Sequence, residues 1–222
     1  MEARPAKDSF AVPEQFLAGA DPVMGRLIRQ HGPCGLQPQA RRQPFESLAR
    51  AIAHQQLNGT AAETILQRFI KLFPARRFPR PEDLCAVDDA AIRAAGFSFA
   101  KIAALRDLAE KSLNGTVPAP RALRALPDEE IIARLTEVRG VGRWTAEMLL
   151  IFQLGRPDIL PADDFGVRSG FARAYGLKEL PKPKALLAHG ERWKPHRTIA
   201  SWYLWRAADP APNGKAGRSK EK

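Results

Sequence analysis

Cysteine is scarce in this sequence, because the 222 residues contain only Cys34 and Cys85. The two lie far apart and belong to no closely spaced cluster, so the sequence indicates no zinc site and no iron–sulfur cluster. This usage of cysteine fits a reducing, intracellular compartment.

Long apolar runs are also missing. The N-terminal stretch MEARPAKDSF has no apolar core, and no window approaches the ~18 consecutive apolar residues of a membrane-spanning helix. We therefore predict a soluble, non-secreted protein with no membrane partner. The expected location is the cytoplasm, in association with the nucleoid, for a bacterial host, and the nucleus for a eukaryotic one.

Acidic residues are too few to balance the basic ones. The chain has 35 Lys and Arg against 24 Asp and Glu, which gives a formal net charge of +11. Such an excess usually indicates a polyanionic partner, most often nucleic acid, although charge alone is also compatible with a merely soluble basic protein. Hydrophobic residues make up 45% of the chain, which is enough to bury a core in one large domain or two small lobes.

The alternation of apolar and polar residues that marks β-strands is nearly absent. Apolar residues instead recur with helical spacing along most of the chain. We predict an all-α protein without an internal repeat. A flexible lead-in is expected over residues 1–12, and a disordered basic tail over residues 208–222.

A glycine-rich segment, RGVGR at residues 139–143, separates two helical patterns. Gly140 and Gly142 permit the positive backbone angles and close approach that a tight turn needs. A helix that begins there points its unpaired N–H groups and positive dipole end outward, where they favour an anion such as a DNA phosphate. Such contacts position a protein on DNA without reading sequence, although a GxG pattern alone also occurs in ordinary helix–helix turns. The predicted backbone-binding residues are Arg139, Gly140, Val141, Gly142, Arg143 and Thr145.

An acidic pair, Asp163 and Asp164, follows Pro161 and precedes a helical pattern that begins with Phe165. At a helix N-terminus one carboxylate can cap the helix while the other faces a cleft. The helix dipole favours the ionised form, whereas the neighbouring like charge opposes it. An ionised carboxylate can stabilise the cationic sugar that forms as a glycosidic bond breaks, and it can orient or deprotonate water. The alternative is that both residues merely cap the helix.

These patterns together resemble the helix-hairpin-helix superfamily of DNA glycosylases, and within it the 3-methyladenine DNA glycosylase II branch of alkylation repair. The resemblance spans about residues 44–206 and is carried by RAIAHQQLNGTAA, GFSFAKIAALRDLA, VRGVGRWTA, LPADDFGVR and ERWKPHRTIASWYLWRA. It implies two helical lobes that flank a basic cleft. The chain is expected to be too short for the extra N-terminal β-rich domain of the larger members.

The resemblance also suggests how the chain is divided. The helix-hairpin-helix glycosylase domain is expected over residues 13–207. One lobe would contain about residues 44–150. The other would contain about residues 13–43 and 151–207.

The chemistry implied by the resemblance depends on the acidic pair. The second aspartate of the family motif is catalytic, which identifies Asp164 as the catalytic residue and Asp163 as the helix cap near the site. An alignment on Arg168, as in some sister families, would make Asp163 the catalyst instead. In members that also cut the strand, a lysine nucleophile occupies the position of Trp144, and tryptophan cannot form a Schiff base. The implied activity is hydrolysis of the N-glycosidic bond of 3-methyladenine and related alkylated purines, without strand cleavage, as the first step of base excision repair.

Base release in duplex DNA requires that the target nucleotide be turned out of the stack. The vacated space must then be filled. Gln56 falls on the plug position of the family, with Gln55 and Leu57 as its neighbours.

The base pocket is expected to be aromatic, because an electron-rich ring attracts a cationic alkylated purine by stacking and cation–π forces. Trp144 and Trp205 match pocket tryptophans of the family, whereas Trp193 and Trp202 are expected to pack. Met148 stands where a close member has a pocket tyrosine.

The implied partner is double-stranded DNA that carries alkylated bases, and the protein is expected to act as a monomer without a required cofactor. In this superfamily, hairpin carbonyls bind a monovalent ion that bridges to a DNA phosphate. The matching carbonyls for a Na⁺ or K⁺ ion belong to Thr136, Val138 and Val141. Two alternatives stay open: a glycosylase for deaminated or other lesioned bases, and a non-catalytic helix-hairpin-helix module that only binds DNA.

Overall fold

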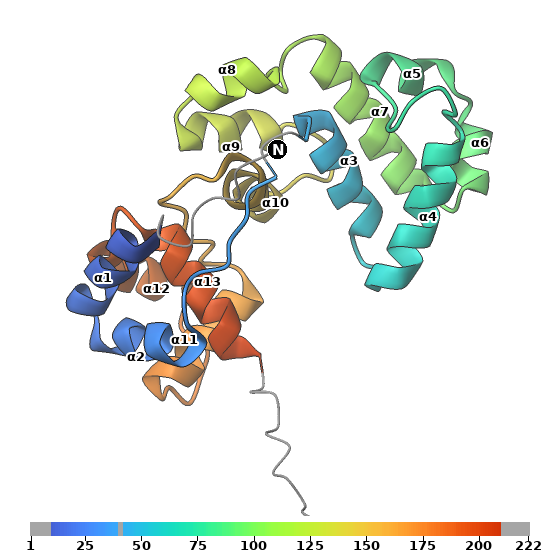
Figure 1. Ribbon diagram of the computed structural model, residues 1–222. Coiled ribbons are helices and arrows are strands. Elements are labelled where there is room, and N and C mark those ends of the chain that lie inside the picture. Colours follow the sequence, from blue (N-terminus) through green and yellow to red (C-terminus); the bar gives the residue numbers. More distant parts are fainter. Residues whose placement is uncertain (1–9, 40–41, 210–222) are drawn as a thin grey trace, which may run out of the picture. The chain divides into compact units, whose positions relative to one another are not determined.

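The computed structural model describes residues 10–39 and 42–209 (Figure 1). Within these ranges every regular element is a helix, which confirms the all-α prediction. No helix in the same ranges is both long and apolar enough to cross a bilayer. The expected lead-in is partly wrong, since a helix already begins at Ala11, where Glu14 and Leu17 continue a helical pattern. The rest of the lead-in and nearly all of the expected tail lie outside the described residues.

The chain forms two compact units, one of residues 1–37 and 156–222 and one of residues 38–155. The chain passes between the units at residues 37–38 and 155–156, and each of these points lies about five residues from the expected one. The reason is pairing between distant segments of the second unit. The Gln39 N–H donates to the Phe152 carbonyl at 2.7 Å, and Gln153 Nε2 donates to the Arg42 carbonyl at 2.6 Å.

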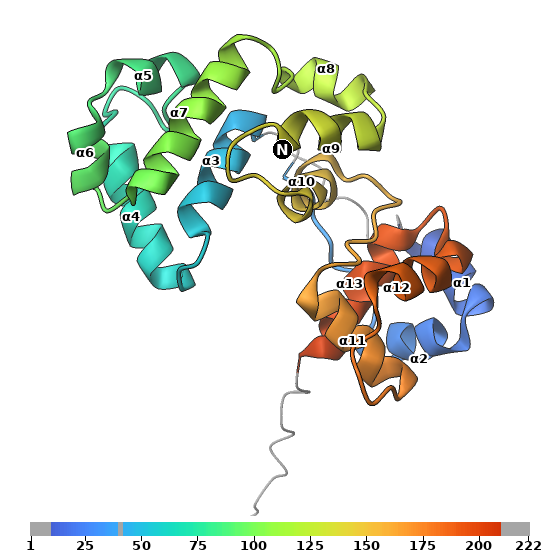
Figure 2. The same cartoon turned by 180° about the vertical axis from the view of Figure 1, so that it is seen from behind.

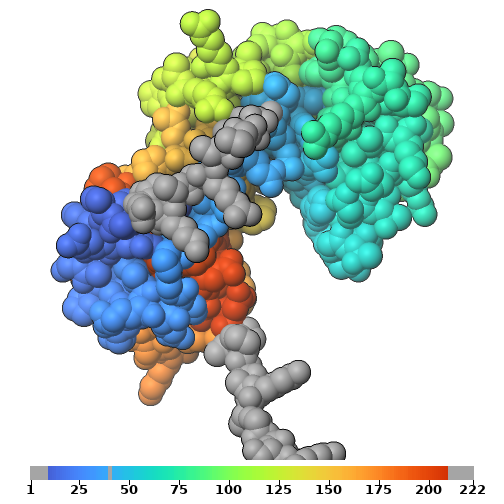
Figure 3. Space-filling model, viewed as in Figure 1, coloured from blue at the N-terminus to red at the C-terminus, as the bar shows by residue number. Residues whose placement is uncertain are grey.

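The first unit is built around its last helix. Its elements are α1 (Ala11–Ala20), α2 (Pro22–His31), α11 (Phe165–Tyr175), α12 (Pro183–Gly190), the short 3₁₀ helix η3 (Glu191–Trp193) and α13 (Arg197–Ala208). Helix α13 packs against α11, α2 and α1, as Figures 1 and 2 show from opposite sides. In the space-filling view, α1 and α2 in blue cover one face of this unit, with α13 in red beside them (Figure 3).

A buried carboxylate ties the first unit together. Asp21, 2% exposed, caps α2 by accepting the Val23 N–H at 2.9 Å. It also accepts hydrogen bonds from the Tyr175 hydroxyl at 2.5 Å and from Trp193 Nε1 at 3.1 Å, and His189 Nε2 lies 3.1 Å away. Burial by itself raises the pKa of Asp21, but the hydrogen bonds outweigh burial, and the pKa lies below its ordinary value.

The second unit is organised around α7. Its elements are α3 (Pro44–His54), α4 (Gly59–Lys71), α5 (Pro81–Ala86), α6 (Asp89–Ala94), α7 (Phe99–Leu113), α8 (Pro120–Ala125), α9 (Asp128–Thr136), α10 (Arg143–Leu149) and a π-helical turn, η2 (Leu150–Leu154). Helix α7 packs against α3, α5 and α6 and buries Ile102, Leu105 and Leu108. The helix that the sequence predicts after the hairpin thus divides into an α part and a π part, and Gly155 ends it at φ +66°.

Candidate active site

The acidic pair lies at the start of α11, which begins at Phe165. The prediction that Asp163 caps this helix would require a start one residue earlier. Asp164, not Asp163, is the N-cap, and its Oδ1 accepts the Val167 N–H at 2.7 Å. The Asp164 N–H in turn donates to the Pro161 carbonyl at 3.0 Å, which closes the turn before the helix. Asp163 is exposed and stands outside the first helical turn. The expected cap role of Asp163 is therefore wrong, while the catalytic role of Asp164 stays a prediction.

The carboxylate of Asp164 also contacts a tryptophan from the last helix. Trp205 Nε1 donates to Asp164 Oδ1 at 2.8 Å. The indole is partly exposed and packs over Gly166, where an added Cβ would lie 2.9 Å from Trp205 Cδ1 and 3.1 Å from Asp164 Oδ1. The absence of a side chain at residue 166 thus lets the indole reach the acid. Sequence reasoning missed Gly166, although its spacing of four residues from Gly170 places both on one face of the helix.

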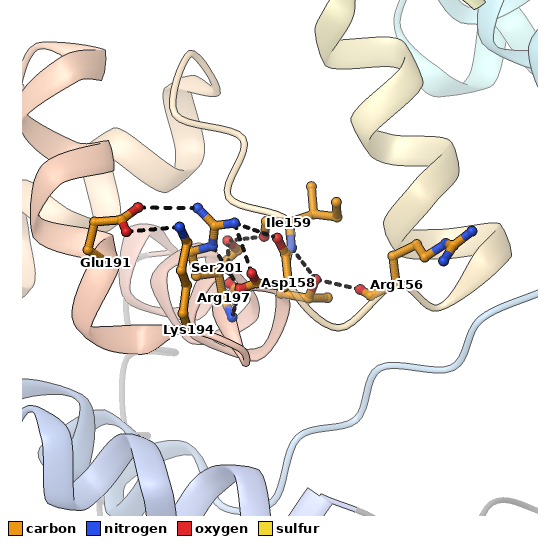
Figure 4. A network of polar contacts seen from close by, with 8 residues as sticks. Arg156, Asp158, Ile159, Glu191, Lys194, Arg197 and Ser201 are labelled. Atoms are coloured by element: carbon orange, nitrogen blue, oxygen red, sulfur yellow. Dashed lines mark hydrogen bonds and ion pairs between the residues drawn. The ribbon is translucent and has the colours of Figure 1, made fainter. Parts of the chain in front are cut away.

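A polar network holds the segment that leads to the acidic pair (Figure 4). Arg197, in the first turn of α13, grips Asp158 with Nε at 2.7 Å and Nη2 at 2.9 Å from its two carboxylate oxygens. Glu191 lies on the other side of the same guanidinium, 3.8 Å from Nη1, and forms an ion pair with Lys194 at 2.8 Å. Paired, forked hydrogen bonds of this kind fix geometry as well as charge.

Hydroxyl groups on α13 continue the network along the same segment. Thr198 Oγ1 donates to the Arg156 carbonyl at 2.6 Å and accepts the Ile159 N–H at 2.9 Å. Ser201 Oγ donates to the Ile159 carbonyl at 3.2 Å (Figure 4). The chain that carries Asp164 is therefore anchored to the same helix that carries Trp205, so both members of the pair share one support.

The glycine hairpin joins α9 to α10 in the second unit. Gly140 has φ +76°, as the sequence predicts, and the Val141 N–H donates to the Val138 carbonyl at 2.9 Å to close the turn. Gly142 has φ −94°, so the expectation of a positive angle there is wrong. Nothing lies within 4 Å of the place that a Cβ of Gly142 would occupy, which leaves room for the close approach of another group. Its role is space rather than backbone conformation.

Two N–H groups of the hairpin are used inside the protein. The Arg139 N–H donates to Asp107 Oδ2 at 2.6 Å, and Lys111 Nζ lies 2.9 Å from the same oxygen. Burial by itself raises the pKa of Asp107, but these donors outweigh burial and lower it. The Arg139 N–H is thus bound to Asp107, and the Val141 N–H closes the turn. Neither N–H group points to a phosphate as the sequence predicts. The first turn of α10 is the part whose N–H groups have no intrahelical acceptor.

The guanidinium of Arg143 is also engaged within the protein. Its Nη2 and Nη1 lie 2.6 and 3.0 Å from the Glu129 carboxylate, and its Nε lies 3.0 Å from Glu147 Oε1. The hydrogen bonds with Glu129 raise the pKa of Arg143. The guanidinium of Arg143 is thus paired with two carboxylates, and its contact with the DNA backbone stays a prediction. Thr145, another predicted backbone contact, is 8% exposed and packs inside.

The predicted plug loop connects α3 to α4. Gln56 has φ +56°, a strained angle for a residue with a side chain, and within the described ranges no other non-glycine residue has a positive φ. The Gln56 and Leu57 side chains are exposed. Gln55 differs, since its Nε2 donates to the Gly140 carbonyl at 2.7 Å and so braces the loop against the hairpin. Lys101 Nζ supports the same loop through the Ala53 carbonyl at 2.7 Å, and burial lowers the pKa of Lys101.

The predicted pocket residues belong to both units. Trp144, on the first turn of α10, is 49% exposed, and Met148 follows one turn later and is partly buried. Trp205 lies with Asp164 in the first unit, whereas Trp144 lies with the hairpin and Gln56 in the second. Trp193 is fully buried, which confirms that it packs.

The carbonyls of Thr136, Val138 and Val141 are the predicted ligands of a monovalent cation. The Val138 carbonyl already accepts the Val141 N–H, but a carbonyl oxygen has a second lone pair. Across residues 10–39 and 42–209 no group of three His, Cys, Asp or Glu side chains is arranged to hold a metal ion. The cation on these carbonyls stays a prediction.

Comparison with protein-family models gives the class of the protein. Residues 49–196 match the HhH-GPD superfamily of base excision DNA repair proteins. The chain belongs to this superfamily. The matched segment begins in α3, before the plug loop, and ends at the residue before α13, so it includes the hairpin and the acidic pair.

Individual relatives are similar over nearly the whole chain. DNA-3-methyladenine glycosylase 1 of Schizosaccharomyces pombe is 39% identical over 216 residues, which are 96% of this chain and 94% of the relative. A solved structure of a 3-methyladenine DNA glycosylase of S. pombe in complex with abasic DNA superposes with a TM-score of 0.77 at 40% identity and covers 88% of this chain and 95% of that one. A DNA-3-methyladenine glycosidase from Bacillus halodurans superposes with a TM-score of 0.80 at 35% identity and covers 88% of both chains.

Proposed function

We propose that this chain is a monofunctional DNA glycosylase that releases alkylated purines, chiefly 3-methyladenine, from duplex DNA. The observation that carries the proposal is the Asp164–Trp205 pair, a carboxylate at a helix start that lies 2.8 Å from an indole N–H. The names of the similar proteins support the substrate class, since they are DNA-3-methyladenine glycosylases. The formal charge of +11 supports a polyanionic partner.

The reaction breaks the bond between C1′ of the deoxyribose and the ring nitrogen of the purine. The bonding electrons leave with the base, so a cationic alkylated purine departs as a neutral molecule and the sugar carries the positive charge. The ionised carboxylate of Asp164 stabilises this cation. Water then adds to C1′, and its proton passes to Asp164 or to solvent. The products are a free base and an abasic site.

The second unit supplies the contacts that prepare the DNA. The first turn of α10 holds a backbone phosphate, and the exposed side chains of Gln56 and Leu57 fill the space that the flipped nucleotide vacates. Trp144 and, in the other unit, Trp205 each offer an aromatic ring on which an alkylated base can stack. We propose that the protein acts as a monomer, with no required cofactor and with a Na⁺ or K⁺ ion on the carbonyls of Thr136, Val138 and Val141.

The absence of a strand-cleaving step is part of the proposal. Trp144 occupies the place that a lysine nucleophile would need, and an indole has no amine for a Schiff base with the sugar. We expect the abasic product to stay intact until alkali is added. Strand cleavage by the purified protein at neutral pH would contradict this part alone.

The central experiment replaces Asp164 by Asn. We expect release of methylated bases to fall by about 10²-fold or more, because the charge that supports the cationic sugar is lost. Asparagine also caps helices well, so the fold and the DNA affinity should change little. The measurement is chromatography of bases released from randomly methylated DNA, together with DNA binding by fluorescence anisotropy.

Asp163→Asn is the matched control, since it removes the neighbouring charge from an exposed position. Full activity of Asp163→Asn is expected. Retained release by Asp164→Asn together with loss in Asp163→Asn would transfer the catalytic role to Asp163. If the unmodified protein forms no abasic sites on methylated DNA, the proposed function is wrong.

A further inference from the structure

Trp205 presents two chemically different parts, a ring face and an indole N–H, and the N–H is directed at the acid. We propose that Trp205 is a positioning residue, whose N–H fixes the orientation of the Asp164 carboxylate. The inference rests on the proposed function, because it assigns Trp205 a task in the reaction of Asp164. It goes beyond base stacking, which uses only the ring face.

The first argument is the number of donors on one oxygen. Asp164 Oδ1 accepts the Val167 N–H at 2.7 Å and Trp205 Nε1–H at 2.8 Å. The donors come from two helices, α11 and α13, so rotation of the carboxyl group would break at least one bond. Hydrogen bonds to a charged group are the stronger ones, so the two donors hold the carboxylate in one orientation.

The second argument is that the backbone of α11 makes space for the indole. A Cβ at Gly170 would lie 1.8 Å from the Leu204 carbonyl oxygen, so α11 and α13 approach to backbone contact. One turn earlier, at Gly166, a Cβ would lie 2.9 Å from Trp205 Cδ1 and 3.3 Å from Nε1. The two glycines therefore let the helices approach closely and let the indole edge reach Asp164.

The same helix provides an internal comparison. Trp202 is also partly exposed, but its ring contacts are with Tyr203, at 4.9 Å between centroids, and with the Arg206 guanidinium, at 5.2 Å. Trp205 and Trp202 thus differ in surroundings: the Trp205 N–H donates to the Asp164 carboxylate, whereas the Trp202 ring packs against Tyr203 and Arg206. Replacing either residue by phenylalanine removes an indole from α13, and only one of these changes removes a donor to Asp164.

The experiment measures release of 3-methyladenine from methylated DNA over a range of DNA concentrations, so that kcat and KM are obtained separately. For Trp205→Phe, which keeps an aromatic ring and removes the N–H, we expect kcat to fall about tenfold as orientation is lost, while KM changes little. Trp202→Phe should leave both constants in place.

A second variant tests the same contact without changing the tryptophan. Gly166→Ala adds a methyl group where the indole edge lies, so it should lower kcat in the same direction as Trp205→Phe. Thermal unfolding of each variant shows that the fold is kept, and if Trp205→Phe does not fold, the kcat of Gly166→Ala decides.

Two results would overturn the inference while leaving the proposed function intact, provided that Asp164→Asn is inactive. One is a kcat of Trp205→Phe equal to that of the unmodified protein. The other is a raised KM with an unchanged kcat, which would mean that only the ring face matters, through binding of the base. Full activity of Asp164→Asn would instead contradict the proposed function itself.

Discussion

The two arginines of the hairpin differ in what they have available for DNA. Arg143 is held by the carboxylates of Glu129 and Glu147, of which Glu147 is only 6% exposed. The Arg139 side chain is exposed. A guanidinium that already neutralises two carboxylates contributes little net positive charge to the field that a phosphate meets.

This difference predicts unequal effects on DNA binding. Arg139→Ala should lower affinity for duplex DNA and reduce the dependence of log K on log salt by about one, as expected for the loss of one phosphate contact. Arg143→Ala should change the salt dependence less. It should instead lower the melting temperature, because it removes the guanidinium that pairs with the buried Glu147 carboxylate. Salt titrations by fluorescence anisotropy and thermal unfolding measure the two effects, and a larger change of salt dependence in Arg143→Ala would contradict the assignment.

At the residue scale, most residues of the candidate site were predictable from the sequence, but their contacts were not. Asp164, Trp205 and Gly140 stand in recognisable motifs, so their positions could be named in advance. The cap assignment failed because a shift of one residue in the helix boundary makes Asp164, rather than Asp163, the N-cap. The pairing of Arg143 with Glu129 depends on how α9 and α10 fold back on each other, which a linear motif does not encode.

At the scale of elements, α11 and α13 cross in close backbone contact at Gly170. Gly170→Ala places a methyl group 1.8 Å from the Leu204 carbonyl oxygen, and backbone cannot yield as a flexible side chain does. We expect a loss of about 1–3 kcal/mol or more in the free energy of unfolding, as is typical of overpacking. Urea unfolding measures it.

Gly19→Ala is the matched control, because it also lies in a helix, α1, and nothing lies within 4 Å of its missing Cβ. Alanine favours helix by about 0.5–1 kcal/mol over glycine, so this variant should be unchanged or slightly more stable. Equal stability of the two variants would show that α11 and α13 do not approach as closely as described.

The plug loop and the hairpin are another pair of elements whose link was not predicted. Helical periodicity located the break between α3 and α4, and the family motif located Gln56. The brace from Gln55 to the Gly140 carbonyl joins residues 85 positions apart, and no local pattern reports it. Gln55 was grouped with the plug because it is adjacent in sequence, whereas its amide is turned to the hairpin.

On the scale of the whole molecule, the buried Asp21 links folding to pH. Its pKa is lowered from 3.8 in the folded state, so its contribution to stability is present above that value. The contribution is lost as the pH falls through the lowered folded-state pKa. We expect the urea midpoint to decrease as the pH falls below about 4, and Asp21→Asn to flatten this decrease while lowering stability at neutral pH. An unchanged acid slope in Asp21→Asn would show that other carboxylates dominate.

The class of the whole fold was predictable, because helical spacing of apolar residues extends along most of the chain. The boundaries of the two units were not. They are set by hydrogen bonds such as the one from the Gln39 N–H to the Phe152 carbonyl. Such bonds attach both connecting segments, residues 38–43 and 151–155, to the second unit. Composition marked the connector as irregular but carried no information on its partner.

The division of the chain has a consequence for the order of events during synthesis. The unit with the hairpin is one continuous segment, residues 38–155, and can fold as soon as it leaves the ribosome. Helices α1 and α2 emerge earlier but pack on α13, which is translated last among the described helices. The segment proposed to hold DNA would therefore be complete before the segment proposed to cut the glycosidic bond, and a nascent chain stalled between them is expected to bind without catalysing.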